Sequence, residues 1–128
     1  MLIVGADHRG EILAKDILHI YSNAKYYFST DYPDIVHIVA KKMKNNNDYA
    51  ILICKTGVGM SIGINRYSYI RGALVNTIPS VRMARKHNNI NVLCIGADTI
   101  QDNIIEMIKT MFDTAFEAGR HEERLQKI

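Results

Sequence analysis

The feature that most constrains this 128-residue chain is the alternation of short apolar runs with amphipathic segments. Apolar runs of the kind that form strands occur at Leu2–Ala6, Lys25–Ser29, Tyr49–Cys54, Ile70–Asn76 and Val92–Gly96. Between and after them, apolar residues recur at helical spacing. Strands that alternate with helices through short loops pair in parallel, with helices on both faces of the sheet. The pattern predicts an α/β fold, a single Rossmann-like three-layer αβα domain with a five-stranded parallel sheet.

The amphipathic segments predict the positions of the helices. We expect them over Glu11–Tyr21, Pro33–Met43, Met60–Tyr67, Pro79–His87, Asp102–Ala118 and Arg120–Ile128. The segment from Asp102 is expected to form the longest helix, which Gly119 ends. The run Ile70–Asn76 lacks polar alternation, which is typical of a strand buried on both faces. Residues 1–128 contain no repeat, linker or second domain.

Composition excludes several function classes. The chain is 48% hydrophobic and 23% charged, as in ordinary globular proteins, and its formal charge of +3 is too small and scattered to indicate nucleic-acid binding. No apolar run is long enough to span a membrane or form a signal peptide, so a cytoplasmic location is expected by default. Cys54 and Cys94 make no disulfide framework, and no metal-ligand spacing is present. Cys94 lies within a predicted strand and is expected to be a buried small hydrophobe.

The stretch Ile51–Ser61 carries the most specific chemistry. An apolar run ends in Cys54 and then breaks into a glycine-rich loop that precedes a helix. Its glycines let backbone amides approach an anion closely, and the same surroundings favour the thiolate of a nearby cysteine. The spacing is neither a Walker loop nor the dinucleotide fingerprint. A plain strand–turn–helix joint, with a cysteine that only fills space, is an equally good interpretation of this stretch alone.

Further polar residues follow other strands. Asp7 and His8 come after the first strand, where such a pair suits a phosphate ligand or an acid–base pair, or caps the next helix. Open parallel sheets bind ligands outside the carboxyl ends of their strands, where the strand order reverses. His87 closes a basic helix, where a histidine is often only stabilised by the helix dipole. Arg120 and Arg124 share one helix face and suit a phosphate clamp or ordinary ion pairs.

Together these groups are the parts needed to abstract a proton beside a carbonyl on a phosphorylated sugar: a thiolate, a hydroxyl, loop amides, imidazoles and paired arginines. Their surrounding motifs, in this order along nearly the whole chain, resemble the type B ribose-5-phosphate isomerases and their relatives acting on six-carbon sugar phosphates. The motifs are Gly5–Gly10, Asp31–Pro33, Ile53–Ile62, Asn65, Ile70-Arg71, Arg85–Asn89 with Asn91–Leu93, and Gly119-Arg120-His121 with Arg124.

The resemblance implies an isomerase that interconverts ribose 5-phosphate and ribulose 5-phosphate through an enediolate, in the non-oxidative pentose phosphate pathway, without metal or organic cofactor. It implies that Cys54 is the base, that Thr56 and the loop amides hold the oxyanion, and that His87 opens the sugar ring. Substrate contacts are implied for Asp7, His8, Tyr32, Lys55, Gly57, Val58, Gly59, Ser61, Asn88, Arg120 and Arg124. Of these, His8, Arg120 and Arg124 would hold the phosphate.

The resemblance also implies an assembly. Members of the family are homodimers or dimers of dimers whose site is shared between subunits. His87, Asn88, Arg120 and Arg124 are therefore expected to reach the substrate from the partner subunit. Neither a nucleic acid nor a membrane is expected as a partner.

Two departures from the family pattern bear on the substrate. Lys55 stands where glycine is usual, and Asp98 stands where an arginine for the phosphate is usual. Arg9 or Lys55 is our candidate for the missing positive charge. An allose-6-phosphate or galactose-6-phosphate isomerase, and a catalytically silent sugar-phosphate-binding module, are the alternative interpretations. A thiol-redox role for Cys54 is a weaker one, because no resolving cysteine stands nearby.

Overall fold

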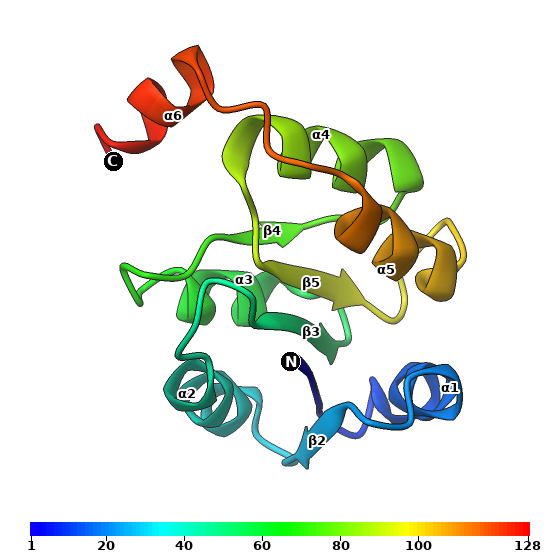
Figure 1. Cartoon of the computed structure of the whole chain (residues 1–128). Coiled ribbons are helices and arrows are strands. Elements are labelled where there is room, and N and C mark those ends of the chain that lie inside the picture. The colour runs from blue at the N-terminus through cyan, green and yellow to red at the C-terminus, as the bar shows by residue number, and fades with distance from the viewer.

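The computed structural model describes residues 1–128 as an open sheet of five parallel strands, in the order β2-β1-β3-β5-β4 (Figure 1). The strands are β1 (Leu2–Ala6), β2 (Lys25–Phe28), β3 (Tyr49–Cys54), β4 (Gly72–Leu74) and β5 (Val92–Gly96). The helices are α1 (Glu11–Ile20), α2 (Tyr32–Lys42), α3 (Val58–Ile64), α4 (Ile78–Asn88), α5 (Ile104–Asp113) and α6 (Arg120–Leu125). No helix combines the length and hydropathy that crossing a bilayer requires.

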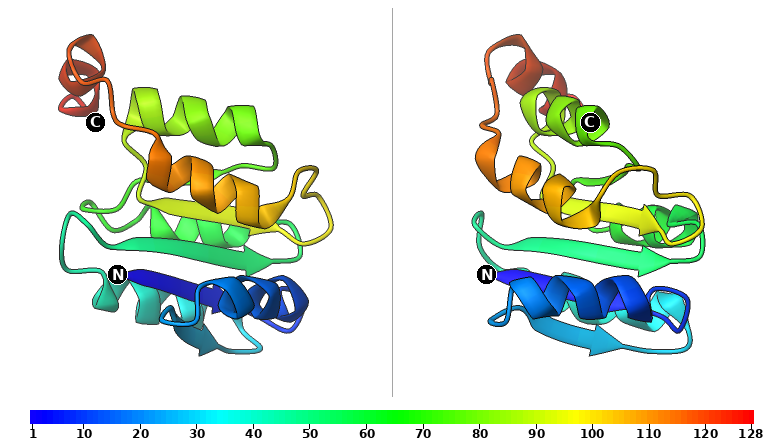
Figure 2. Two further views of the ribbon diagram at one scale, coloured as in Figure 1. Left: turned by 45° about the vertical axis from the view of Figure 1, so that its right-hand side comes forward. Right: turned by 90° about the vertical axis from the view of Figure 1, so that its right-hand side faces the viewer.

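Helices cover both faces of the sheet, which confirms the predicted three-layer α/β arrangement (Figure 2). Alternate residues of β3 enter different cores, because successive side chains of a strand point to opposite faces. Ile51 and Ile53 pack with α1, α4 and α5, whereas Ala50 and Leu52 pack with α2 and α3. The central strands β1, β3 and β5 are therefore almost entirely apolar, as expected for a sheet buried on both faces.

The strand order places a topological switch point between β1 and β3. From β1 the chain moves outward to β2, and it then crosses back to add β3 on the other side of β1. This reversal separates the helices at the carboxyl ends of the two strands, where open parallel sheets bind ligands. Asp7, directly after β1, donates its amide to the carbonyl of Ile53 at 3.2 Å. The residues after β1 and β3 therefore lie side by side.

The fourth strand was predicted too long and too buried. β4 has only three residues and pairs only with β5. It is thus an edge strand, and Leu74 at its end is 47% exposed. Absence of alternation in Ile70–Asn76 was therefore misleading, because most of that run is loop on either side of a short edge strand.

The C-terminal third also differs from the prediction. α5 ends at Asp113 and has 10 residues, so it is shorter than α2 and α4 with 11 each. Thr114 is extended, and the chain from there is hydrogen-bonded to α4. The Thr114 carbonyl accepts from Arg85 Nε at 3.1 Å, and the Glu117 amide donates to the Lys86 carbonyl at 3.1 Å. These contacts replace the helical hydrogen bonds that the apolar spacing predicted. The boundaries of α3 and α6 shift as well, with α3 starting at Val58 and α6 ending at Leu125.

Candidate functional site

Cys54 ends β3 at the carboxyl ends of the strands, beside the switch point between β1 and β3. Its Sγ accepts a hydrogen bond from the Gly57 amide at 3.2 Å, and the residue keeps 7% of its surface exposed. Cys94, in contrast, is completely buried, as predicted. Burial raises the pKa of the Cys94 thiol to about 12, so this sulfur stays protonated and inert. Cys54 is therefore the cysteine available for chemistry.

The loop after Cys54 is held by its own side chains. Gly57 has φ +78, and a Cβ there would meet Leu74 at 2.7 Å, so only glycine fits this turn. The turn aims the Gly57 amide at the sulfur, and the Val58 amide donates to Thr56 Oγ1 at 3.3 Å. The Gly59 amide donates to no group in the chain. Of the three amides predicted to hold an oxyanion, Gly59 thus presents the one without an internal partner.

Asp7 and His8 lie next to this loop, after β1. One carboxylate oxygen of Asp7, Oδ1, accepts the amides of Arg9 at 2.9 Å and Gly10 at 3.2 Å. These bonds hold the carboxylate in place and leave its second oxygen free for a ligand. Asp7 is buried, whereas His8 is exposed. The pair therefore combines a fixed acceptor with an accessible imidazole.

Tyr32 comes from the other side of the loop, as the first residue of α2. Its ring lies against Gly59, where an added Cβ would meet a ring carbon at 2.5 Å. Glycine at this position thus lets the tyrosine close over the loop. Ser61 is half-buried on α3, near the same turn.

The two residues that depart from the family pattern are neighbours. The Asp98 amide donates to the Lys55 carbonyl at 3.0 Å, and both side chains are exposed. The segment after β5 therefore runs alongside the Cys54 loop. The negative charge of Asp98 thus stands next to a segment that carries the positive charge of Lys55.

The remaining predicted site residues lie at the other end of the strands, away from their carboxyl ends. α4 starts at the carboxyl ends of the strands and runs back along the sheet, and its 11 residues span roughly 16 Å. His87 and Asn88 are at its far end, and α6, with the exposed Arg120 and Arg124, packs beyond it. Figure 2 (left) shows the arrowheads of β1, β3 and β5 pointing away from α6. Within one chain, these four residues are not brought to Cys54.

His87 belongs to a cluster that sequence reasoning did not assemble. Its ring stacks on that of His121, with centroids 4.2 Å apart and planes 16° apart. Glu117 Oε1 lies 3.8 Å from His87 Nε2 and 3.6 Å from His121 Nε2. Desolvation, together with the positive charges of His87 and Arg120, lowers the pKa of His121. No sequence spacing signals this cluster, because α4 contributes one member and the chain after α5 the other two.

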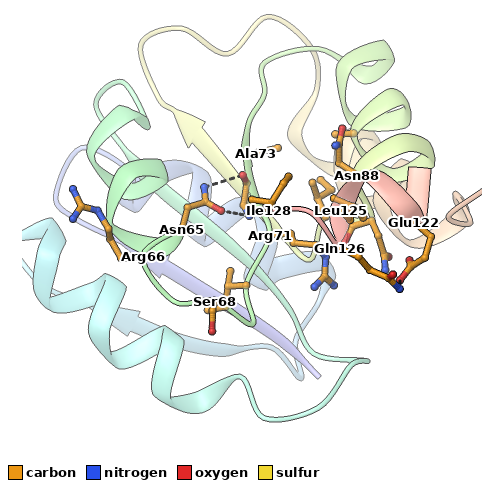
Figure 3. A pocket seen from close by; sticks show the side chains of 15 residues that line it. Asn65, Arg66, Ser68, Arg71, Ala73, Asn88, Glu122, Leu125, Gln126 and Ile128 are labelled. Atoms are coloured by element: carbon orange, nitrogen blue, oxygen red, sulfur yellow. Dashed lines mark hydrogen bonds between the residues drawn. The ribbon is translucent and has the colours of Figure 1, made fainter. Parts of the chain in front are cut away.

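A cavity of about 840 Å³ lies on the side of this second group of residues (Figure 3). It is a groove between the α3–β4 connection, the end of α4, and α6. Polar and charged side chains line much of it, among them Asn65, Arg71, Asn88 and Glu122. Cys54 and its loop are not part of this groove.

The whole chain also matches known proteins. Residues 2–128 match the family described as Ribose/Galactose Isomerase. The chain belongs to the ribose/galactose isomerase family. This confirms the resemblance stated from the motifs, and it agrees with a fold that places Cys54 and a glycine loop at the switch point.

Known relatives align with this chain over nearly their full length. A putative sugar phosphate isomerase of Rickettsia conorii is 38% identical, with 99% of this chain and 96% of the relative covered. A probable ribose-5-phosphate isomerase B of Mycoplasma genitalium is 34% identical, with 99% and 92% covered. A solved structure of ribose-5-phosphate isomerase B from Mycoplasma genitalium with bound ribulose-5-phosphate has a TM-score of 0.88 at 35% identity, covering 98% of this chain and 91% of that one.

Proposed function

We propose that this protein is a ribose-5-phosphate isomerase that interconverts ribose 5-phosphate and ribulose 5-phosphate. Membership of the family makes it a sugar phosphate isomerase of the ribose-5-phosphate isomerase B type. The observation that carries the finer proposal is the position of Cys54 Sγ, at the switch point between β1 and β3, where it accepts a hydrogen bond from the Gly57 amide. That amide stabilises negative charge on sulfur, as a proton-abstracting base requires.

In the proposed reaction Cys54 removes the proton from C2 of the open-chain aldose and returns it to C1. The electron pair moves onto the carbonyl oxygen, so the intermediate is an enediolate whose charge needs fixed hydrogen-bond donors. The Gly59 amide is one candidate donor. Thr56 is the other, because its Oγ1 accepts from Val58 and its hydroxyl proton is left free for the substrate. The free oxygen of Asp7 and the ring of Tyr32 would contact the sugar.

The second half of the proposed site comes from another copy of the chain. Ring opening by His87 and phosphate binding by Arg120 and Arg124 need these three groups near Cys54. Within one chain, however, Cys54 lies at the carboxyl ends of the strands and the three groups lie toward the other end. A two-fold pairing would bring the carboxyl edge of one subunit to α4 and α6 of its partner. The assembly is thus proposed to be a homodimer or a dimer of dimers.

A substrate panel tests the proposal. Purified protein is assayed with ribose 5-phosphate, allose 6-phosphate and galactose 6-phosphate, and binding of each is measured separately. We expect kcat/KM for ribose 5-phosphate to exceed the others by at least about tenfold, because one added carbon in a closed pocket costs that much. A preference for either six-carbon sugar would overturn the assignment. Binding without turnover would indicate a silent sugar-phosphate-binding module.

A further inference from the structure

We propose that His87, Glu117 and His121 form a binding site for a divalent transition-metal ion, with Zn²⁺ as the best fit, and that an ion bound there inhibits the enzyme by withdrawing His87. The inhibition rests on the proposed role of His87 in ring opening, whereas the metal site itself does not.

The donor set and its spacing fit zinc. Two imidazoles and one carboxylate are ligands that Zn²⁺ takes readily. Their ligand atoms all lie within 4.8 Å of one another, and Glu117 Oε1 is 3.6 and 3.8 Å from the two Nε2 atoms. Atoms bound to one tetrahedral zinc at its usual bond lengths lie about 3.3 Å apart. The two distances from Glu117 to the imidazoles therefore need only a small contraction.

One ring must also turn. The two imidazole planes are 16° apart, and lone pairs in nearly parallel rings do not meet at one ion. Rotation of the His87 ring about its Cβ–Cγ bond corrects this, since the rings of His87 and His121 make no polar contact in the chain apart from those to Glu117. The His87 and Glu117 side chains are 37% and 50% exposed, whereas His121 is 10% exposed. The cluster thus combines one buried ligand with two that adjust.

The backbone holds the three residues together without an ion. The Glu117 amide donates to the last turn of α4, next to His87. After it, Ala118 and Gly119 both have φ 58, a left-handed conformation that is unusual for alanine. This bend presents Glu117 and His121 on the same side of the chain, toward His87. Strain of this kind is often kept where a site requires it.

The charges around the cluster have both signs. Arg120 and Arg124 of α6 are exposed beside it and repel a cation. The carboxylate of Glu117 supplies the negative charge of the site.

Direct titration tests the metal site. Zn²⁺ is titrated against a chromophoric chelator in a Cys54→Ser background, which removes the competing thiolate. We expect one zinc per chain, an affinity at least about tenfold lower in Glu117→Gln, and no change in Glu123→Gln, an exposed carboxylate of α6 outside the cluster. His121→Asn should also weaken binding. Absence of zinc binding, or equal affinity in Glu117→Gln, would overturn the site.

Inhibition is tested with Cys54 intact. Zinc should suppress turnover and a chelator should restore it. Glu117→Gln should match the parent without zinc and need at least about tenfold more zinc for half-inhibition. Equal sensitivity of parent and variant would mean that zinc acts at Cys54 and would refute the inhibition through His87. Protein with no isomerase activity at all would contradict the proposed function instead, while the titration would still decide the metal site.

Discussion

The two halves of the proposed site are built in different ways. The Cys54 loop consists of consecutive residues between β3 and α3, and it lies on the sheet between two strands of the core. The other half combines the end of α4 with the chain from Thr114 to Leu125, which runs beyond the sheet (Figure 1). The first depends on local turn geometry, and the second depends on contacts between distant segments.

The supports of the two halves differ accordingly. Cys54 is held in the pairing of β3 with β5, and its carbonyl also accepts the amide of Ala97, just after β5, at 2.8 Å. In α6, only His121 is buried, and the segment before it is tied to α4 by a few hydrogen bonds. Few buried apolar contacts mean low local stability. A rigid base with its anion donors is thus paired with a looser group of residues, which a second subunit would help to hold.

The largest expected effect separates the two cysteines. Cys54→Ser should lower kcat by at least about 10²–10³-fold, which is typical for losing a single oxyanion donor and a lower bound for losing the base. Cys94→Ala should keep the rate and lose only about 1 kcal/mol of stability through a small buried cavity. Both are measured by a coupled assay and chemical unfolding. A normal rate for folded Cys54→Ser would eliminate Cys54 as the base.

Mixing inactive variants tests whether the halves belong to different subunits. Cys54→Ser and His87→Asn should each be inactive alone. After unfolding and refolding together, half the dimers contain both chains, and each has one intact site, so about a quarter of the parent activity should return. Activity that stays at the level of the separate variants would place both groups in one subunit's site.

A smaller effect concerns only the looser half. Gly119→Ala puts a side chain on a backbone with φ 58 and ψ −127, where a Cβ meets no atom within 4 Å. The cost is therefore conformational, about 1–3 kcal/mol, and should fall on the docking of α6. Hydrogen exchange should quicken after Thr114 and stay unchanged in β3. Ala118→Gly is the matched control and should slow that exchange, because it relieves a positive φ. Faster exchange throughout the sheet in Gly119→Ala would contradict this separation.

The smallest expected effect returns to the Cys54 half and its phosphate. If Lys55 or Arg9 replaces the usual arginine, Lys55→Ala or Arg9→Ala should raise KM for ribose 5-phosphate about two- to fivefold, since exposed charge pairs contribute little. kcat should change less than KM. Unchanged KM values in both variants would reject a role for either residue.

Several features were readable from the sequence because they depend on neighbouring residues. The strands β1, β3 and β5 were predicted with the bounds observed, and the helix expected over Pro33–Met43 is found as α2, shifted by one residue at each end. Failures occurred where distant contacts override local pattern. The length and burial of β4 were predicted wrongly because strand order decides which strand lies at an edge. The predicted helix of α5 was too long because Arg85 hydrogen-bonds to the Thr114 carbonyl, where the helix has ended.

By itself the sequence determined the α/β class, the place of Cys54 at a strand end and the glycine loop after it, because spacing and turn chemistry act over a few residues. Only the tertiary structure decided that β1 and β3 flank the switch point, that His87 and α6 lie at the far edge, and that Glu117 joins two histidines. Those relations arise from strand order and from the packing of α4 with the C-terminal chain, and neither is encoded at any fixed separation along the chain.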